Sequence, residues 1–142
     1  MTLPDITDRE HDELALLRRV VGTFRATEQR RRFPVSVHVG RLDGERTSFE
    51  VPHVAGGLDP AAAFDLLDSA LAGERPTEVD GWLTRPGVPA LHDHDLLWMR
   101  ATLAVLGSRG SSLRSFHTVT RTGWLDVRSG ESRVWKRLRI DR

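Results

Sequence analysis

Arginine and tryptophan side chains near the end of the chain have the clearest potential for binding chemistry. In an expected strand over residues 132–140, alternation puts four such side chains on one side, and a fifth lies beside them on the preceding strand. We call this set the basic face: Arg121, Arg133, Trp135, Arg137 and Arg139. Guanidinium groups can hold phosphates while an indole ring stacks on a base. The basic face therefore predicts an acidic partner, with nucleic acid first and an acidic protein surface second.

The same face has explanations other than an external partner, and one of them is that Trp135 simply covers the bare backbone of Gly123. Arg121 and Arg137 are expected directly opposite each other, and like charges in such positions repel unless an anion lies near them. The acidic start of the first helix could supply that negative charge within one chain. It could also do so between two copies, in which case the basic face supports self-association.

A second candidate site lies where two expected strands end. Thr84 and Arg85 close one strand, Thr120 and Arg121 lie on the next, and a helix begins between them near Asp93. The carboxyl ends of parallel strands and the N-terminus of a helix favour anionic ligands. These four residues predict an anion pocket of a small enzyme or ligand-binding protein. The alternative is that Thr merely suits strands and Arg suits exposed ends, since neither glycine-rich phosphate-binding motif is present.

Metal binding and nucleophilic catalysis have weaker support. His92, Asp93, His94 and Asp95 are consecutive, so their side chains diverge, and only His92 and His94 with His117 form a plausible ligand set. Asp93 is more simply a helix N-cap. There is no Gly-x-Ser-x-Gly motif and no cysteine. We therefore expect no metal, no cofactor and a protein without catalytic activity, with a small enzyme as the alternative.

Composition limits the class of protein. The chain has 142 residues, of which 39% are hydrophobic and 29% charged, as expected for one globular domain over residues 1–142. No apolar run reaches the roughly 20 residues that span a bilayer, and the N-terminus does not resemble a secretory signal. Without cysteine, a disulfide framework and an iron–sulfur cluster are excluded. We expect a cytoplasmic protein that does not contact membranes.

Charge is divided unevenly along the chain. Residues 1–96 carry 11 Arg against 17 Asp and Glu, a net charge of −6. Residues 97–142 carry nine Arg and one Lys against three acidic residues, a net charge of +7. Such an asymmetry concerns association rather than fold. Either the two parts neutralise each other within the domain, or the basic part faces an acidic partner.

The first third of the chain predicts a helix and a hairpin. Thr7 and Glu10 match a capping box, and a stripe of apolar residues with helical spacing follows as far as Pro34. The next turn, residues 42–44, suits a three-residue loop with Gly44 in the left-handed conformation. This loop pairs Val37 with Phe49, so that the apolar side chains of both strands share one face.

The remaining elements complete an α+β or α/β fold. Asp59 and Pro60 begin a second helix, a strand covers 79–84, and a mostly apolar third helix starts near Asp93. The last hairpin is expected to pair a strand over 113–127 with 132–140, with Gly123 opposite Trp135. The element order is α-β-β-α-β-α-β-β. It predicts a mixed five-stranded sheet, in which two antiparallel hairpins are joined through parallel crossovers and pack with three helices.

Overall fold

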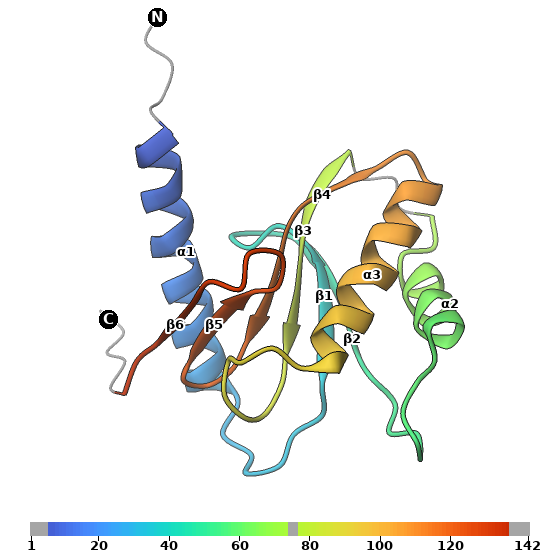
Figure 1. Cartoon of the computed structure of the whole chain (residues 1–142), viewed down its shortest axis with the longest axis horizontal. Helices are drawn as coiled ribbons and strands as arrows, with labels where there is room; N and C mark the ends of the chain where they lie inside the picture. The colour runs from blue at the N-terminus through green and yellow to red at the C-terminus, as the bar shows by residue number, and fades with distance from the viewer. Residues whose placement is uncertain (1–5, 74–76, 137–142) are drawn as a thin grey trace, which may run out of the picture.

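Six strands form one mixed sheet with helices on both of its faces (Figure 1). The computed structural model describes the backbone of residues 6–73 and 77–136, and within these ranges the side chains from residue 11 onward. The helices are α1 (Ile6–Thr27), α2 (Pro60–Ala70) and α3 (Asp93–Ser108). The strands are β1 (Ser36–Gly40), β2 (Arg46–Glu50), β3 (Glu78–Thr84), β4 (Ser112–Val119), β5 (Gly123–Asp126) and β6 (Ser132–Val134). Their order in the sheet is β2-β1-β3-β4-β5-β6.

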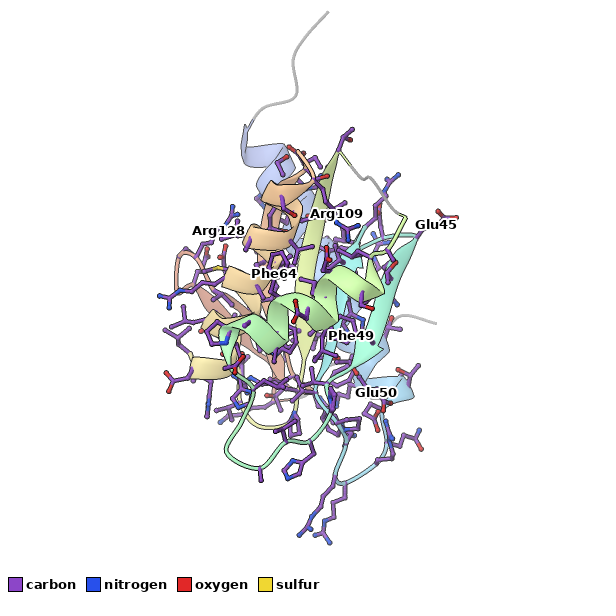
Figure 2. All side chains as sticks on the ribbon, turned by 90° about the vertical axis from the view of Figure 1, so that its right-hand side faces the viewer. Glu45, Phe49, Glu50, Phe64, Arg109 and Arg128 are labelled. Atoms are coloured by element: carbon purple, nitrogen blue, oxygen red, sulfur yellow. The ribbon has the colours of Figure 1, made fainter. Side chains whose placement is uncertain are left out.

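The two faces of the sheet carry separate hydrophobic clusters. Helices α2 and α3 pack on one face, where Leu83 and Phe116 join Leu67 and Trp98 in the larger cluster. Helix α1 lies on the opposite face and buries Leu17 and Val21 against Trp82, Val119 and Trp124. Figure 2 views the molecule from the α2 side and labels Phe64 of α2 and Phe49 of β2, which are partly buried against this larger cluster. The expected α+β class and its three helices are therefore confirmed.

The first hairpin has the predicted register, but the prediction of a left-handed Gly44 was wrong, because Gly44 does not have a positive φ. Val37 pairs with Phe49 and His38 pairs with Ser48. The backbone N–H of Val51 also donates to the carbonyl of Val35 at 2.7 Å, which extends the pairing beyond the strands. Val37 and Phe49 belong to the cluster beneath α2 and α3, so His38 and Ser48 lie on the α1 face. The alternation of apolar and polar residues was sufficient to predict this register, because a shift by one residue would expose all the buried apolar side chains of the hairpin.

Helix boundaries agree with the sequence at α2 and differ at α1 and α3. The Asp59 side chain caps α2 by accepting from the N–H of Ala62 at 2.7 Å. Helix α1 ends at Thr27, well before Pro34, so the three arginines 30–32 follow the helix rather than close it. The expected capping box of α1 lies outside the described side chains. In α3 the N-cap is His92, and the prediction of Asp93 in that role was wrong.

The last third of the chain has three strands where two were expected. Residues 113–127 do not form one strand, because the chain reverses at Thr120 and β4 pairs antiparallel with β5. The Thr120 hydroxyl accepts from the N–H of Thr122 at 3.2 Å, while the N–H of Thr120 donates to the carbonyl of Gly123 at 2.9 Å. A side chain that bonds its own backbone two residues on favours a turn over continued strand pairing. The sheet therefore has six strands, and the prediction of five was wrong.

The register of the final hairpin also differs by one residue. Gly123 pairs with Val134 instead of Trp135, and the N–H of Asp126 bonds the carbonyl of Glu131 at 2.7 Å. The loop between these residues is therefore longer than the three-residue turn that the sequence suggested. The expected pairs Thr120–Leu138 and Arg121–Arg137 involve residues outside the described ranges.

The crossover connections are parallel, as predicted. Strands β3 and β4 are adjacent and parallel, with α3 between them in sequence. Strands β2 and β3 are each antiparallel to β1, which lies between them, so they run in the same direction on either side of it. This arrangement brings the polar face of the β1–β2 hairpin next to β3.

The backbone of β6 lies so close to Gly123 that a side chain on this residue would not fit. A Cβ atom there would lie 1.9 Å from the carbonyl oxygen of Arg133. We expect Gly123→Ala to separate β6 from β5 and to lower the free energy of unfolding by about 1–3 kcal/mol, the usual cost of overpacking. Urea denaturation measures this loss. Gly107→Ala is the control, because a Cβ at that position of α3 meets no atom within 4 Å and so should not destabilise the fold.

Candidate functional site

The described part of the basic face lies at one edge of the sheet. All three residues of β6 are exposed, and the guanidinium carbon of Arg133 lies 5.6 Å from the centre of the Trp135 ring. Trp135 itself is partly buried against the α1 cluster, and its N–H donates to the carbonyl of Thr122 at 2.7 Å. Arg121 lies beside Thr122 in the β4–β5 turn and is partly exposed. Arg137 and Arg139 lie outside the described residues.

Two arginines of the basic C-terminal part are neutralised within the domain. Arg109 bonds the Asp68 carboxylate at 2.7 Å and also donates to the carbonyls of Asp68 and Leu71 at the end of α2. Arg114 forms two hydrogen bonds with the Asp80 carboxylate. Burial opposes the ionisation of Asp80, but hydrogen bonds from Arg114 and Ser115 hold the pKa of this carboxyl below its usual value. By contrast, Arg121 and Arg133 form no ion pair with any described residue.

Thr84 and Arg85 have other partners than an external anion. The Thr84 hydroxyl lies 2.8 Å from Nε2 of His38. Arg85 is buried, and its guanidinium bonds both oxygens of Asp95 at 2.9 and 3.0 Å. Its remaining N–H groups donate to three carbonyls of the following loop, those of Pro86, Val88 and Ala90. All five donors of the guanidinium are therefore used inside the protein.

Thr120 and Arg121, the other two residues of the expected anion pocket, do not form an open site either. Thr120 is fully buried and its hydroxyl serves the turn that precedes β5. The N–H of Arg85 bonds the carbonyl of Val119, so the ends of β3 and β4 are neighbours as predicted. Arg121 forms no ion pair within 4.0 Å among the described residues, although its charge acts on Glu28 at longer range. The strand ends meet, but their polar groups mainly bond one another.

The three histidines of the expected metal-ligand set lie in two separate places. His92 and His94 are exposed at the start of α3 with ring centres 6.4 Å apart, whereas His117 is buried within β4. Among the described residues, no group of three or more His, Cys, Asp or Glu side chains is arranged to hold a metal ion. The carboxylate of Asp95, at the third position of α3, bonds the N–H of His92 at 2.9 Å. This end of α3 is thus organised around Asp95.

A row of polar and aromatic side chains crosses the α1 face of the sheet and was not recognised from the sequence. The paired residues are Ser48, His38, Trp82, His117 and Asp126, one from each of β2, β1, β3, β4 and β5. His38 bonds Ser48 through Nδ1 at 2.7 Å and stacks on Trp82 with ring centres 5.2 Å apart. Burial and the nearby Arg46 charge lower the pKa of His38 to about 4. Burial also lowers the pKa of His117, although the charges of Asp126 and Asp80 oppose that shift.

Beside this row, α1 and the β1–β2 hairpin enclose a groove of about 680 Å³. His38, Arg46, Trp82 and Thr84 line its sheet side, and Phe24 is among the residues that line its helix side. Arg46 lies over the Trp82 ring at 5.2 Å from the ring centre. The predicted register of the first hairpin, which pairs Val37 with Phe49 and so places His38 opposite Ser48, was the one available signal for this site. Nothing local in the sequence indicated that α1 would lie alongside them.

Comparisons with known proteins leave the site to be interpreted from its geometry. The chain matches no protein-family model, no curated protein and no solved structure. Within residues 6–73 and 77–136, no helix is both long and apolar enough to cross a membrane.

Proposed function

We propose that this chain is a small cytoplasmic binding protein without catalytic function, which holds single-stranded nucleic acid on the basic face. The observation that carries this proposal is the position of Arg133 over the Trp135 ring on an exposed edge strand. A guanidinium plane that rests on an indole offers a flat surface to an unpaired base. Its N–H groups have no hydrogen-bond partner among the described residues and can bond a phosphate oxygen.

The surroundings of this pair support an anionic partner. Arg121 and Arg133 have no carboxylate within ion-pair distance among the described residues, and Lys136 next to Trp135 is exposed. Arg109 and Arg114 do have such partners, whereas at this edge Arg121 acts on the Glu28 carboxylate only at longer range. Positive charge without a direct ion pair at a sheet edge favours a polyanion over a neutral ligand.

The competing enzyme or small-ligand role at the strand ends has less support. It needs Arg85 to bind an anion, yet all the N–H groups of that side chain are engaged within the domain. An acidic protein surface and self-association use the same basic face. The binding experiment therefore distinguishes these two partners from nucleic acid.

Binding of a labelled oligothymidylate, followed by fluorescence anisotropy, tests the proposal. Between about 50 and 200 mM salt, affinity should fall with a log–log slope of about −0.7 for each phosphate contact. We expect Arg133→Glu to weaken binding at every salt concentration and to make that slope shallower by about one contact. Trp135→Ala should cost more on the single strand than on a duplex, because stacking of an unpaired base contributes about 1–3 kcal/mol.

Arg100→Glu is the matched control for this experiment. Arg100 is an exposed arginine of α3, and that helix packs on the opposite face of the sheet from α1. The same charge change there should alter affinity far less than Arg133→Glu. Absence of binding by the unaltered protein at low salt, or equal losses in both variants, would show that the basic face does not bind nucleic acid. If Arg133→Glu instead abolished a dimer seen by light scattering, the partner would be a second copy.

A further inference from the structure

The groove beside α1 exists because the helix covers only part of its sheet face. Helix α1 packs on β5 and on the aromatic residues Trp82 and Trp124. The polar side of the β1–β2 hairpin remains uncovered next to the helix, and the two surfaces bound a space of about 680 Å³. That volume lies within the range of about 300–1,000 Å³ that is typical of small-molecule sites. None of the described residues of the basic face lines it.

The two sides of the groove differ in chemistry. The helix contributes the partly buried apolar side chains Leu16, Val20 and Phe24. The hairpin contributes the polar residues Ser36 and His38 to the lining. An apolar wall opposite a polar wall suits a ligand with an apolar body and a polar group.

The acidic residues of the groove each have an arginine nearby. Glu28 forms an ion pair with Arg30 at 2.7 Å, and the hydrogen bond from Arg30 lowers the pKa of Glu28. Asp43 lies 3.4 Å from Arg41. The negative charge of Glu50 also favours the charged form of Arg30. Arg30 thus serves both Glu28 and Glu50, and Arg41 serves Asp43.

Two arginines of the groove are not balanced in this way. Arg19 on α1 and Arg46 on β2 both line the groove, and neither forms an ion pair with a described residue. Arg46 is held over the Trp82 ring, which restricts its side chain without neutralising its charge. The site therefore offers one cation from each wall to a ligand.

His38 makes the polar wall rigid. One ring nitrogen bonds Ser48 at 2.7 Å, the other bonds Thr84 at 2.8 Å, and the ring stacks on Trp82. A side chain fixed by two hydrogen bonds and one ring contact loses little freedom when a ligand binds. The groove is thus preformed on its sheet side.

From these observations we infer that the groove binds a small amphipathic anion. The ligand carries one carboxylate or sulfonate on an apolar body of aromatic or hydrocarbon character. Its anionic group pairs with Arg19 and Arg46, and its body packs against Leu16, Val20 and Phe24. This site is separate from the proposed nucleic-acid surface, so the two can be tested independently.

Fluorescence titration with 8-anilinonaphthalene-1-sulfonate tests the inference, because this probe combines an aromatic body with one sulfonate. The unaltered protein should show one saturable site. Arg46→Gln should raise the dissociation constant of the probe about tenfold, as expected for the loss of a charge-assisted hydrogen bond. Arg19→Gln should raise it several-fold. Decanoate should displace the probe, whereas decanol of equal chain length should not, because only decanoate carries the anionic group.

Arg18→Gln provides the matched control. Arg18 is the exposed neighbour of Arg19 on α1 and does not line the groove, so its replacement should leave probe affinity unchanged. Arg133→Glu should also leave it unchanged, which separates this site from the basic face. Absence of probe binding by the unaltered protein would overturn the inference. So would retained affinity in Arg46→Gln together with loss in Leu97→Gln, since Leu97 lines the other large groove, between α2 and α3.

Discussion

Replacement of Asp95 by Ala should lower the free energy of unfolding by about 3–5 kcal/mol, the cost of leaving a buried charge without its partner. The Asp95 side chain is fully buried, and only 8% of the Arg85 side chain is exposed. Three carbonyls would still accept hydrogen bonds from Arg85 in the variant, but no negative charge would remain beside it. Urea denaturation at neutral pH measures the loss.

Asp95 also joins three elements, which adds to the expected effect. Its carboxylate accepts from Arg85 after β3, from the Thr118 hydroxyl of β4 at 2.7 Å, and from the N–H of His92 at the start of α3. Removal of the carboxylate leaves the Arg85 and Thr118 donors without this partner in the domain interior. A buried donor without a partner costs about 1–3 kcal/mol. The variant should therefore also loosen α3 from the sheet.

Two further variants make this prediction specific. Asp93→Ala removes an exposed carboxylate from the same helical turn and should change stability by no more than about 0.5 kcal/mol. The double variant Arg85→Met with Asp95→Leu removes both charges and should recover part of the loss, because paired buried charges can be replaced by apolar groups at little cost. If Asp95→Ala were as stable as Asp93→Ala, the ion pair would not stabilise this fold.

The Arg85–Asp95 pair also shows where interpretation of the sequence alone was insufficient. An arginine at the end of a parallel strand was interpreted as an anion ligand, because that location favours external anions in many sheets. Asp95 occupies the same location from the N-terminus of α3 and takes the role of the anion. The residues between them turn their carbonyls toward the guanidinium. Nothing in residue spacing distinguishes an internal anion from an external one.

The success at the first hairpin and the error at the last one have one physical cause. In β1 and β2 only one face is apolar, so a single register buries Val37 and Phe49 together. In β4 both faces are buried, because Phe116 packs beneath α3 and His117 lies on the α1 face. Alternation then gives no indication of where the strand ends. The turn depends on the Thr120 hydroxyl, a local signal weaker than the continuous run of strand-forming residues.

The groove could not be predicted because it depends on the position of one helix. The apolar stripe of α1 indicated which side would be buried, and Leu17 and Val21 are buried as expected. The stripe did not indicate that α1 would pack on β5 and leave the hairpin face open. Arg46 and Trp82 are distant in sequence and meet only through the pairing of β1 with both β2 and β3.

Acidification should destabilise the fold between about pH 6.5 and pH 4, before the carboxylates lose their charge. The pKa of His38 is lowered by burial and by Arg46 from 6.5 to about 4 in the folded state. Over this interval the unfolded chain binds more protons than the folded chain, so stability is complete above the upper value and falls as pH decreases. We expect His38 to account for roughly 2–3 kcal/mol of this loss. His117 contributes in the same direction, because burial lowers its pKa as well.

Urea denaturation of His38→Gln across the same pH interval separates His38 from all other groups. Glutamine can still bond Ser48 and Thr84 but does not take up a proton, so the dependence of stability on pH should become shallower while stability at neutral pH changes less. His53→Gln, in the exposed loop after β2, is the control and should keep the pH dependence of the unaltered protein. Protonation of His38 would place a second positive charge near that of Arg46 on the wall of the groove. If His38→Gln lost stability on acidification as steeply as the unaltered protein, the burial of a neutral His38 would not be the cause.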